Sequence, residues 1–156
     1  MAISTRPSSI ENLSLDKDVQ LKIPFYDETI LPEDYCARYV RLSSDFIFGK
    51  KFPVADAWKM RDMKRIYGLN INNSEFPHLA KLEFVLPGML VGLQVNDTKY
   101  NKDTREYTHL SLYLGTQKGK PLFLEQYGTE IRTMNLNDYM LGKMEIREVL
   151  DTKIHN

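Results

Sequence analysis

The chain has 156 residues with a single cysteine, and its 21 basic residues are balanced by 21 acidic ones. This length suits one domain that can bury a core without stabilisation by a metal ion or disulfide bonds. A lone cysteine excludes an intramolecular disulfide. The balanced charge, without a basic stripe, argues against nucleic acid as a partner. The apolar runs are too short to span a membrane, and a secretory signal is missing. We therefore expect a soluble protein made in the cytoplasm without a signal peptide.

Residues 1–20 are polar and show no apolar periodicity. We interpret them as an N-terminal extension that is mobile or lies as a strap across the surface. Residues 21–156 are then expected to form one domain.

A helical pattern begins at Pro32, which suits a first helical turn, and Gly49 suits a stop. Between Cys36 and Ile47, apolar side chains and Ser43 recur on one face of this helix. Cys36 lies near its start, where unpaired N–H groups and the helix dipole favour a thiolate. The position predicts a nucleophile, with a small apolar core residue as the alternative.

Two further helical segments are expected, over 55–67 and within 74–82, with loop at 70–73. From residue 89 the hydrophobic period becomes that of strands. We predict strands over residues 89–95, 107–114, 122–127, 130–133 and 144–149. The charged stretch 96–106 is expected to be a hairpin loop, either solvated or in contact with a substrate. Helices followed by a run of strands predict an α+β domain with a largely antiparallel sheet.

The chain has three histidines, and His109 is the best candidate for a catalytic base. His155 is next to the last residue, and His78 follows a proline in a loop or short helix. His109 begins a predicted strand whose even-numbered leucines fill one face, the expected core, while His109 belongs to the opposite face. A distant cysteine and histidine outline a thiol enzyme, although a structural histidine is the alternative.

A cysteine–histidine pair needs a third polar group to orient the imidazole ring. The next strand offers Glu125 and Gln126 near its end. Alternation places Glu125 on the same face as His109, and Gln126 takes this position only if a bulge shifts the register. An exposed polar pair on an edge strand is the alternative.

No cofactor is expected from the pattern of residues. A single cysteine and scattered histidines give no metal-ligand spacing. Gly88 and Gly92 lie before or within a strand and lack the following helix that a phosphate loop requires.

Four segments, in order, resemble the NlpC-like branch of papain-fold cysteine peptidases, which includes the CHAP amidases. They are the cysteine opening a helix at 35–40, Pro-Gly-Met-Leu-Val at 87–91, His-Leu-Ser-Leu-Tyr-Leu-Gly at 109–115, and the strand and turn at 123–132. Three of the four segments differ from the family pattern at one or more residues. The family commonly has Asp-Cys-Ser-Gly where this chain has Tyr35-Cys36-Ala37-Arg38, its Gly-Asp is Gly-Met here, and its third residue, often histidine, aligns with Glu125.

The resemblance implies a papain-like fold in which N-terminal helices pack on the sheet. It implies Cys36 as nucleophile, His109 as base and Glu125 or Gln126 as the orienting group. Tyr26 matches a tyrosine that the family places upstream of the nucleophile. Together with Tyr35 and backbone N–H groups at the helix start, it is expected beside the substrate and its oxyanion.

The function implied by the resemblance is hydrolysis of an amide bond in a peptide, with cell-wall peptide as the expected substrate. An extracellular substrate would require delivery by a route other than a signal peptide, as for phage or effector enzymes. Two alternatives remain open at this point. One is an acyltransferase, deamidase or thioesterase on the same fold, and the other is a non-catalytic binding or structural protein with a buried Cys36.

Overall fold

The computed structural model describes residues 8–25, 36–52, 85–95, 109–128, 130–141 and 144–150. The helical segments predicted over 55–67 and 74–82, the loop at 70–73 and the charged loop at 96–106 lie outside these residues. The described chain combines two helices with mostly antiparallel strands, which confirms the predicted α+β class. Within the described part, no helix is long and apolar enough to cross a membrane.

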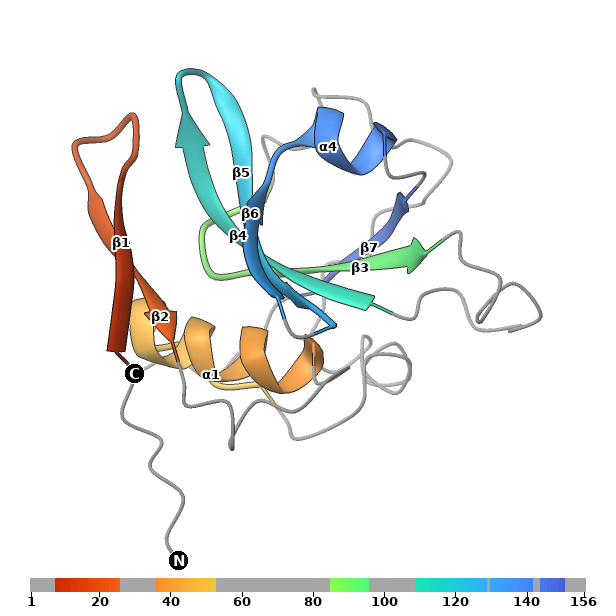
Figure 1. Ribbon diagram of the computed structural model, residues 1–156, viewed down its shortest axis with the longest axis horizontal. Helices are drawn as coiled ribbons and strands as arrows, with labels where there is room; N and C mark the ends of the chain where they lie inside the picture. The colour runs from red at the N-terminus through yellow and green to blue at the C-terminus, as the bar shows by residue number, and fades with distance from the viewer. Residues whose placement is uncertain are drawn as a thin grey trace, which may run out of the picture.

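A five-stranded antiparallel sheet forms the centre of the molecule, with the spatial order β6-β5-β4-β3-β7 (Figure 1). Its strands are β3 (Leu90–Val95), β4 (His109–Gln117), β5 (Lys120–Tyr127), β6 (Glu130–Met134) and β7 (Met144–Leu150). All five strands predicted after residue 89 are present, with their ends moved by a few residues. The hydrophobic alternation was therefore sufficient to find them.

The N-terminal segment differs from the prediction, because β1 (Ser8–Ser14) and β2 (Gln20–Phe25) pair as a separate two-stranded sheet. The expected boundary after residue 20 falls inside this hairpin. The turn of the hairpin is tied to the β4–β5 turn, where the Asp16 carboxylate accepts the backbone N–H of Lys118 and of Gly119, both at 2.7 Å. Backbone pairing and a carboxylate clamp need little apolar periodicity, so the sequence pattern did not reveal this hairpin.

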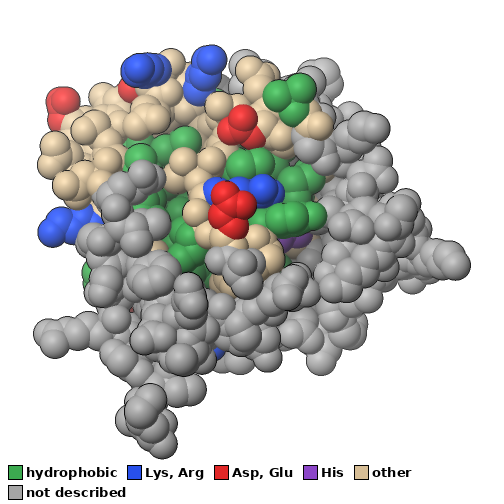
Figure 2. All heavy atoms as spheres, viewed as in Figure 1, with side chains coloured by type: hydrophobic (Ala, Val, Ile, Leu, Met, Phe, Trp, Pro, Cys, Tyr) green, Lys and Arg blue, Asp and Glu red, His purple; other side chains and the backbone are tan. Residues whose placement is uncertain are grey.

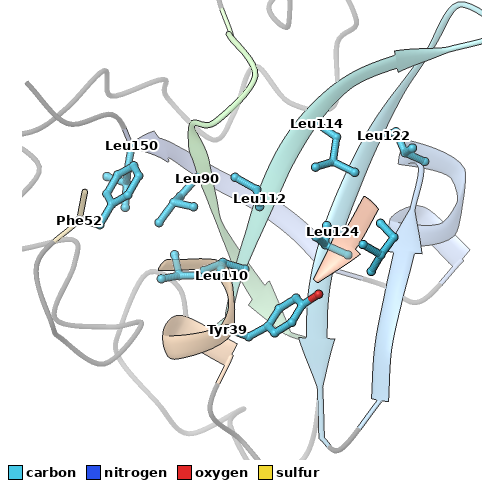
Figure 3. Close-up of a cluster of buried hydrophobic side chains, with 11 residues drawn as sticks. Tyr39, Phe52, Leu90, Leu110, Leu112, Leu114, Leu122, Leu124 and Leu150 are labelled. Atoms are coloured by element: carbon cyan, nitrogen blue, oxygen red, sulfur yellow. The ribbon is translucent and has the colours of Figure 1, made fainter. Parts of the chain in front are cut away.

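Helix α1 (Cys36–Phe48) packs against β4 and β5 and covers one side of the sheet. The leucines of alternate positions on these strands point toward it, and Figure 3 shows Leu110 and Leu124 nearest to the ring of Tyr39. The Tyr39 hydroxyl donates to the Pro24 carbonyl at 2.7 Å, which ties the helix to β2. Ser44 likewise donates to the Gly88 carbonyl at 2.8 Å. We call this face of the sheet the α1 side.

The opposite face is also buried, although the sequence analysis assigned the core to the leucine face alone. It is covered by the short helix α4 (Leu136–Leu141), which the sequence did not predict, and we call it the α4 side. Reciprocal hydrogen bonds cap this helix: Asp138 N–H donates to Asn135 Oδ1 at 3.0 Å, and Asn135 N–H donates to Asp138 Oδ2 at 2.8 Å. An apolar cluster that includes Tyr113, Phe123 and Tyr139 fills this side.

Candidate active site

Cys36 is the first residue of α1 in the described chain and is half-buried. Burial by itself raises the pKa of its thiol. A hydrogen bond with His109 and the charge of that ring act in the opposite direction, as do the backbone N–H groups of Leu110 and Ala37. The net effect lowers the pKa of Cys36 below its ordinary value of 9.0. A helix start next to a histidine therefore favours the thiolate.

His109 begins β4 and is buried, with 4 % of its surface exposed. Its Nε2 lies 3.3 Å from Glu125 Oε2, in an ion pair that lacks the alignment of a good hydrogen bond. Burial lowers the pKa of the ring. The charge of Glu125 and contacts with Cys36 outweigh burial and raise the pKa of His109 to about 10. The edge of the ring also packs against Tyr127, with the two centroids 5.5 Å apart. The site therefore favours an imidazolium.

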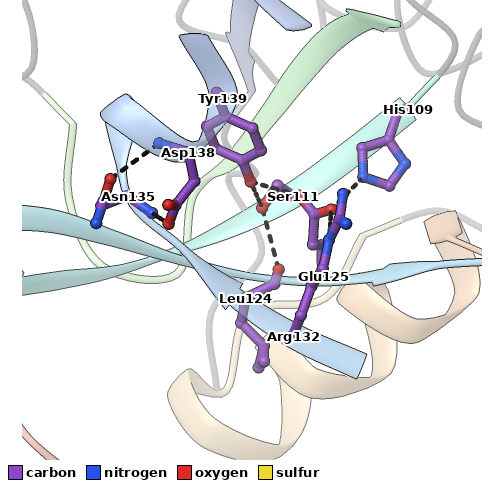
Figure 4. A network of polar contacts seen from close by, with 8 residues as sticks. All are labelled: His109, Ser111, Leu124, Glu125, Arg132, Asn135, Asp138 and Tyr139. Carbon is purple, nitrogen blue, oxygen red and sulfur yellow. Dashed lines mark hydrogen bonds and ion pairs between the residues drawn. The ribbon is translucent and has the colours of Figure 1, made fainter. Parts of the chain in front are cut away.

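Glu125 lies on β5 with no exposed surface, and both of its carboxylate oxygens are engaged (Figure 4). The Tyr139 hydroxyl donates to Oε1 at 2.5 Å, and Arg132 Nε donates to Oε2 at 2.8 Å. Burial raises the pKa of the carboxyl. The charge and hydrogen bond of His109, together with Tyr139 and Arg132, reverse this effect and keep the pKa below its usual value. Glu125 is thus an ionised carboxylate held inside the protein.

The strand register decides between the two candidates for the third residue. Leu112 pairs with Leu124, and a bulge falls between Tyr113 and Gly115, on the turn side of these residues. The register near His109 is therefore not shifted, and the structure brings Glu125 to the histidine. Gln126 belongs to the other face by alternation, and its amide donates to the Gly128 carbonyl at 2.9 Å. Tyr26 and Tyr35 lie outside the described residues.

Sequence reasoning missed three residues that surround Glu125. Arg132 is directly opposite Glu125 in the β5–β6 pair, so the register of these strands could have revealed an ion pair across them. The guanidinium carbon also lies 4.4 Å from the centroid of the Tyr127 ring. Ser111 and Tyr139 meet near the carboxylate. Strand alternation puts Ser111 on the face of His109, but local sequence gave no signal for Tyr139, because α4 is far from β4 along the chain.

Charge balance is the main electrostatic property of the site. Along the chain of contacts, the anionic forms of Cys36 and Glu125 alternate with two cations, His109 and Arg132. Figure 2 shows a small group of acidic and basic side chains with hydrophobic ones beside it on the viewed face, and Glu125 is not among them because it has no exposed surface. His109 and Glu125 are buried, so water screens their ion pair poorly. The arrangement can supply a nucleophilic thiolate and, next to it, a proton donor.

The described residues contain no group of three His, Cys, Asp or Glu side chains placed to hold a metal ion.

Comparison of the chain with models of known protein families, with curated proteins and with solved structures found no match.

Proposed function

We propose that this protein is a thiol hydrolase that cleaves an amide bond, built on an NlpC-like variant of the papain fold. The observation that carries the proposal is the chain of contacts from Cys36 to His109 to the buried Glu125. The order of the four sequence motifs and a helix packed on an antiparallel sheet support the same conclusion. Peptide of the cell wall is the substrate class that the resemblance favours.

The proposed reaction begins with the Cys36 thiolate, which attacks the carbonyl carbon and forms a C–S bond. The carbonyl electron pair moves onto oxygen, where backbone N–H groups at the start of α1 stabilise it. The C–N bond then breaks, and the His109 imidazolium gives its proton to the leaving amine. Neutral His109 next takes a proton from water, which hydrolyses the thioester and releases Cys36. Glu125 keeps the ring oriented throughout and stabilises its charged form.

A merely structural Cys36 is the main competing interpretation, because its side chain also packs against the apolar cluster on the α1 side. Apolar packing explains a buried cysteine. It does not explain a buried glutamate and histidine beside that cysteine, since burying ionised groups is unfavourable even when they are paired. Perturbed titratable groups gathered around a thiol are more typical of a functional site.

Hydrolysis of purified peptidoglycan tests the proposal, with release of amino groups as the measurement. We expect activity in the wild type and a loss to background in Cys36→Ser, because the hydroxyl is a far weaker nucleophile than a thiolate. At pH 6.5 the Cys36→Ser variant should unfold at nearly the same denaturant concentration as the wild type. A variant that keeps its activity would contradict the role of Cys36. Activity only toward other acyl acceptors would favour an acyltransferase, which passes through the same thioester.

The state of the thiol is tested without any substrate, by the pH dependence of iodoacetamide labelling. We expect the wild-type labelling midpoint to lie below the value of about 8.5 for a free cysteine. In His109→Ala the midpoint should move back toward that value. Ordinary midpoints in both proteins would favour a structural Cys36.

A further inference from the structure

Tyr139 reaches the candidate active site from its far side. It is carried by α4, is 1 % exposed, and points toward β4 and β5 (Figure 4). Its hydroxyl meets Glu125 Oε1, whereas His109 and Arg132 meet Oε2. The Tyr139 hydroxyl is the donor observed at Oε1.

The Tyr139 hydroxyl can donate only one hydrogen bond. The hydroxyl has one proton, and an ionised carboxylate has none to offer, so the 2.5 Å contact takes the tyrosine proton. The Ser111 oxygen lies 2.7 Å from the Tyr139 oxygen and 3.2 Å from the Leu124 carbonyl oxygen. Because the Tyr139 proton goes to Glu125, the single Ser111 proton serves one of these two contacts at a time. The edge of the Tyr139 ring also packs against Phe123, with centroids 5.5 Å apart. The hydroxyl is therefore held in a single orientation toward Glu125.

The groups that face Glu125 come from three elements packed around it. His109 and Ser111 lie on β4, Arg132 on β6 and Tyr139 on α4. Two of these groups are cationic and act on the same oxygen. Without Tyr139, Oε1 of the buried Glu125 would lose this hydrogen bond. Such an oxygen takes up a proton more readily or turns toward other partners.

We propose that Tyr139 is a positioning residue of the thiol site, and that its hydroxyl keeps Glu125 ionised and facing His109. This inference rests on the proposed function, because it concerns the state of the Cys36–His109 pair. When Glu125 is ionised, His109 stays cationic and Cys36 stays a thiolate. When Glu125 takes up a proton, the buried imidazolium loses its counter-charge, and the neutral thiol and imidazole become favoured. Tyr139 thereby extends the range of pH over which the thiolate exists toward acid.

The test compares Tyr139→Phe with Tyr113→Phe. Both tyrosines are buried in the apolar cluster of the α4 side, and each substitution removes only a hydroxyl. Tyr113 serves as the matched control because burial is the one cause that shifts its pKa, with no contribution from Glu125. The measurement is the rate of iodoacetamide labelling against pH, which reports Cys36 alone because the chain has one cysteine.

The acid limb of the labelling profile is the low-pH range in which the labelling rate falls because the Cys36 thiolate takes up a proton. We expect Tyr139→Phe to move this limb to higher pH by about one unit, since it removes one hydrogen bond to a charged group. Tyr113→Phe should match the wild type. If the wild-type thiol reacts at low pH but Tyr139→Phe does not move the limb, the role of Tyr139 is overturned while the thiolate–imidazolium pair stands. If wild type and His109→Ala both titrate as an ordinary thiol, the proposed function and this inference fail together.

A second variant keeps the inference open to refutation if Tyr139→Phe does not fold. Ser111→Ala removes the oxygen that lies against the Tyr139 hydroxyl and leaves the tyrosine in place. We expect it to move the acid limb in the same direction by a smaller amount. A limb identical to that of the wild type, with Tyr139→Phe unfolded, would overturn the inference.

Discussion

The two sides of the central sheet are built from alternate residues of the same strands, yet they bury different chemistry. The α1 side buries leucines from β3, β4 and β5 against the helix. The α4 side buries aromatic rings and also a polar group made of His109, Ser111 and Glu125. The α1 side gains stability from apolar area removed from water. The α4 side gains less, because ionised groups must give up hydration before they pair.

This difference indicates which side carries a function. A sheet can be covered on both sides by apolar residues alone, and such packing is often as stable as a buried ion pair or more so. The α4 side instead keeps a carboxylate with three partners next to a histidine and, through it, a thiol. Cys36 itself is carried by α1 and packs against the apolar cluster of the α1 side, so the proposed site joins groups from both sides of the sheet.

The largest expected effect on stability comes from the α1 side. Leu112→Ala removes a side chain with no exposed surface and leaves a cavity. It should lower the free energy of unfolding by about 2–5 kcal/mol, measured by urea denaturation. Labelling of Cys36 in the folded variant should keep the wild-type midpoint, because Leu112 points away from Glu125. A shifted midpoint would show that the two sides are not separate in function.

The next prediction concerns turnover and distinguishes the role of Glu125 from that of Gln126. Glu125→Ala should lower turnover on the order of a hundredfold, because the base loses the group that orients and charges it. Gln126→Ala is the matched control and should lose much less, since Gln126 bonds to Gly128 on the other side. The turnover of Glu125→Gln should lie between the turnovers of these two variants, because glutamine keeps a hydrogen-bond acceptor but lacks the charge. Steady-state kinetics of the three variants measure this, and a greater loss in Gln126→Ala would reverse the assignment.

A further prediction concerns stability against pH. His109 has a pKa of about 10 when folded and 6.5 when unfolded, so its contribution is complete below pH 6.5 and is lost as pH rises toward 10. Cys36 has a pKa below its ordinary 9.0, so its contribution is complete above pH 9.0 and is lost as pH falls through the folded pKa. Between pH 6.5 and 9.0 the two slopes oppose each other and largely cancel.

Cys36→Ser should remove this cancellation. Only His109 then titrates, and the free energy of unfolding should fall above pH 6.5 by up to about 1.4 kcal/mol per pH unit. The wild type should stay nearly level over the same range. Urea midpoints measured from pH 6.5 to 9.0 compare the two proteins. Parallel curves would mean that Cys36 and His109 do not share a proton in the folded state.

Much of the site was predictable because its determinants are local. Helical periodicity placed Cys36 at the start of α1, and strand alternation put Glu125 on the face of His109. Both patterns repeat within a few residues and arise from the geometry of one element. The α+β class followed from the order of these elements along the chain.

The features that the sequence did not predict depended on contacts between distant parts of the chain. Helix α4 has six residues, too few to be stable alone, and it exists where its cap and its buried face meet the sheet. Tyr139 and Arg132 gain their roles only when β5, β6 and α4 come together around Glu125. The β1–β2 hairpin is likewise anchored by Asp16 at the β4–β5 turn. Local sequence thus determined which groups could do chemistry, and tertiary packing determined their charge, because burial and partners set each pKa.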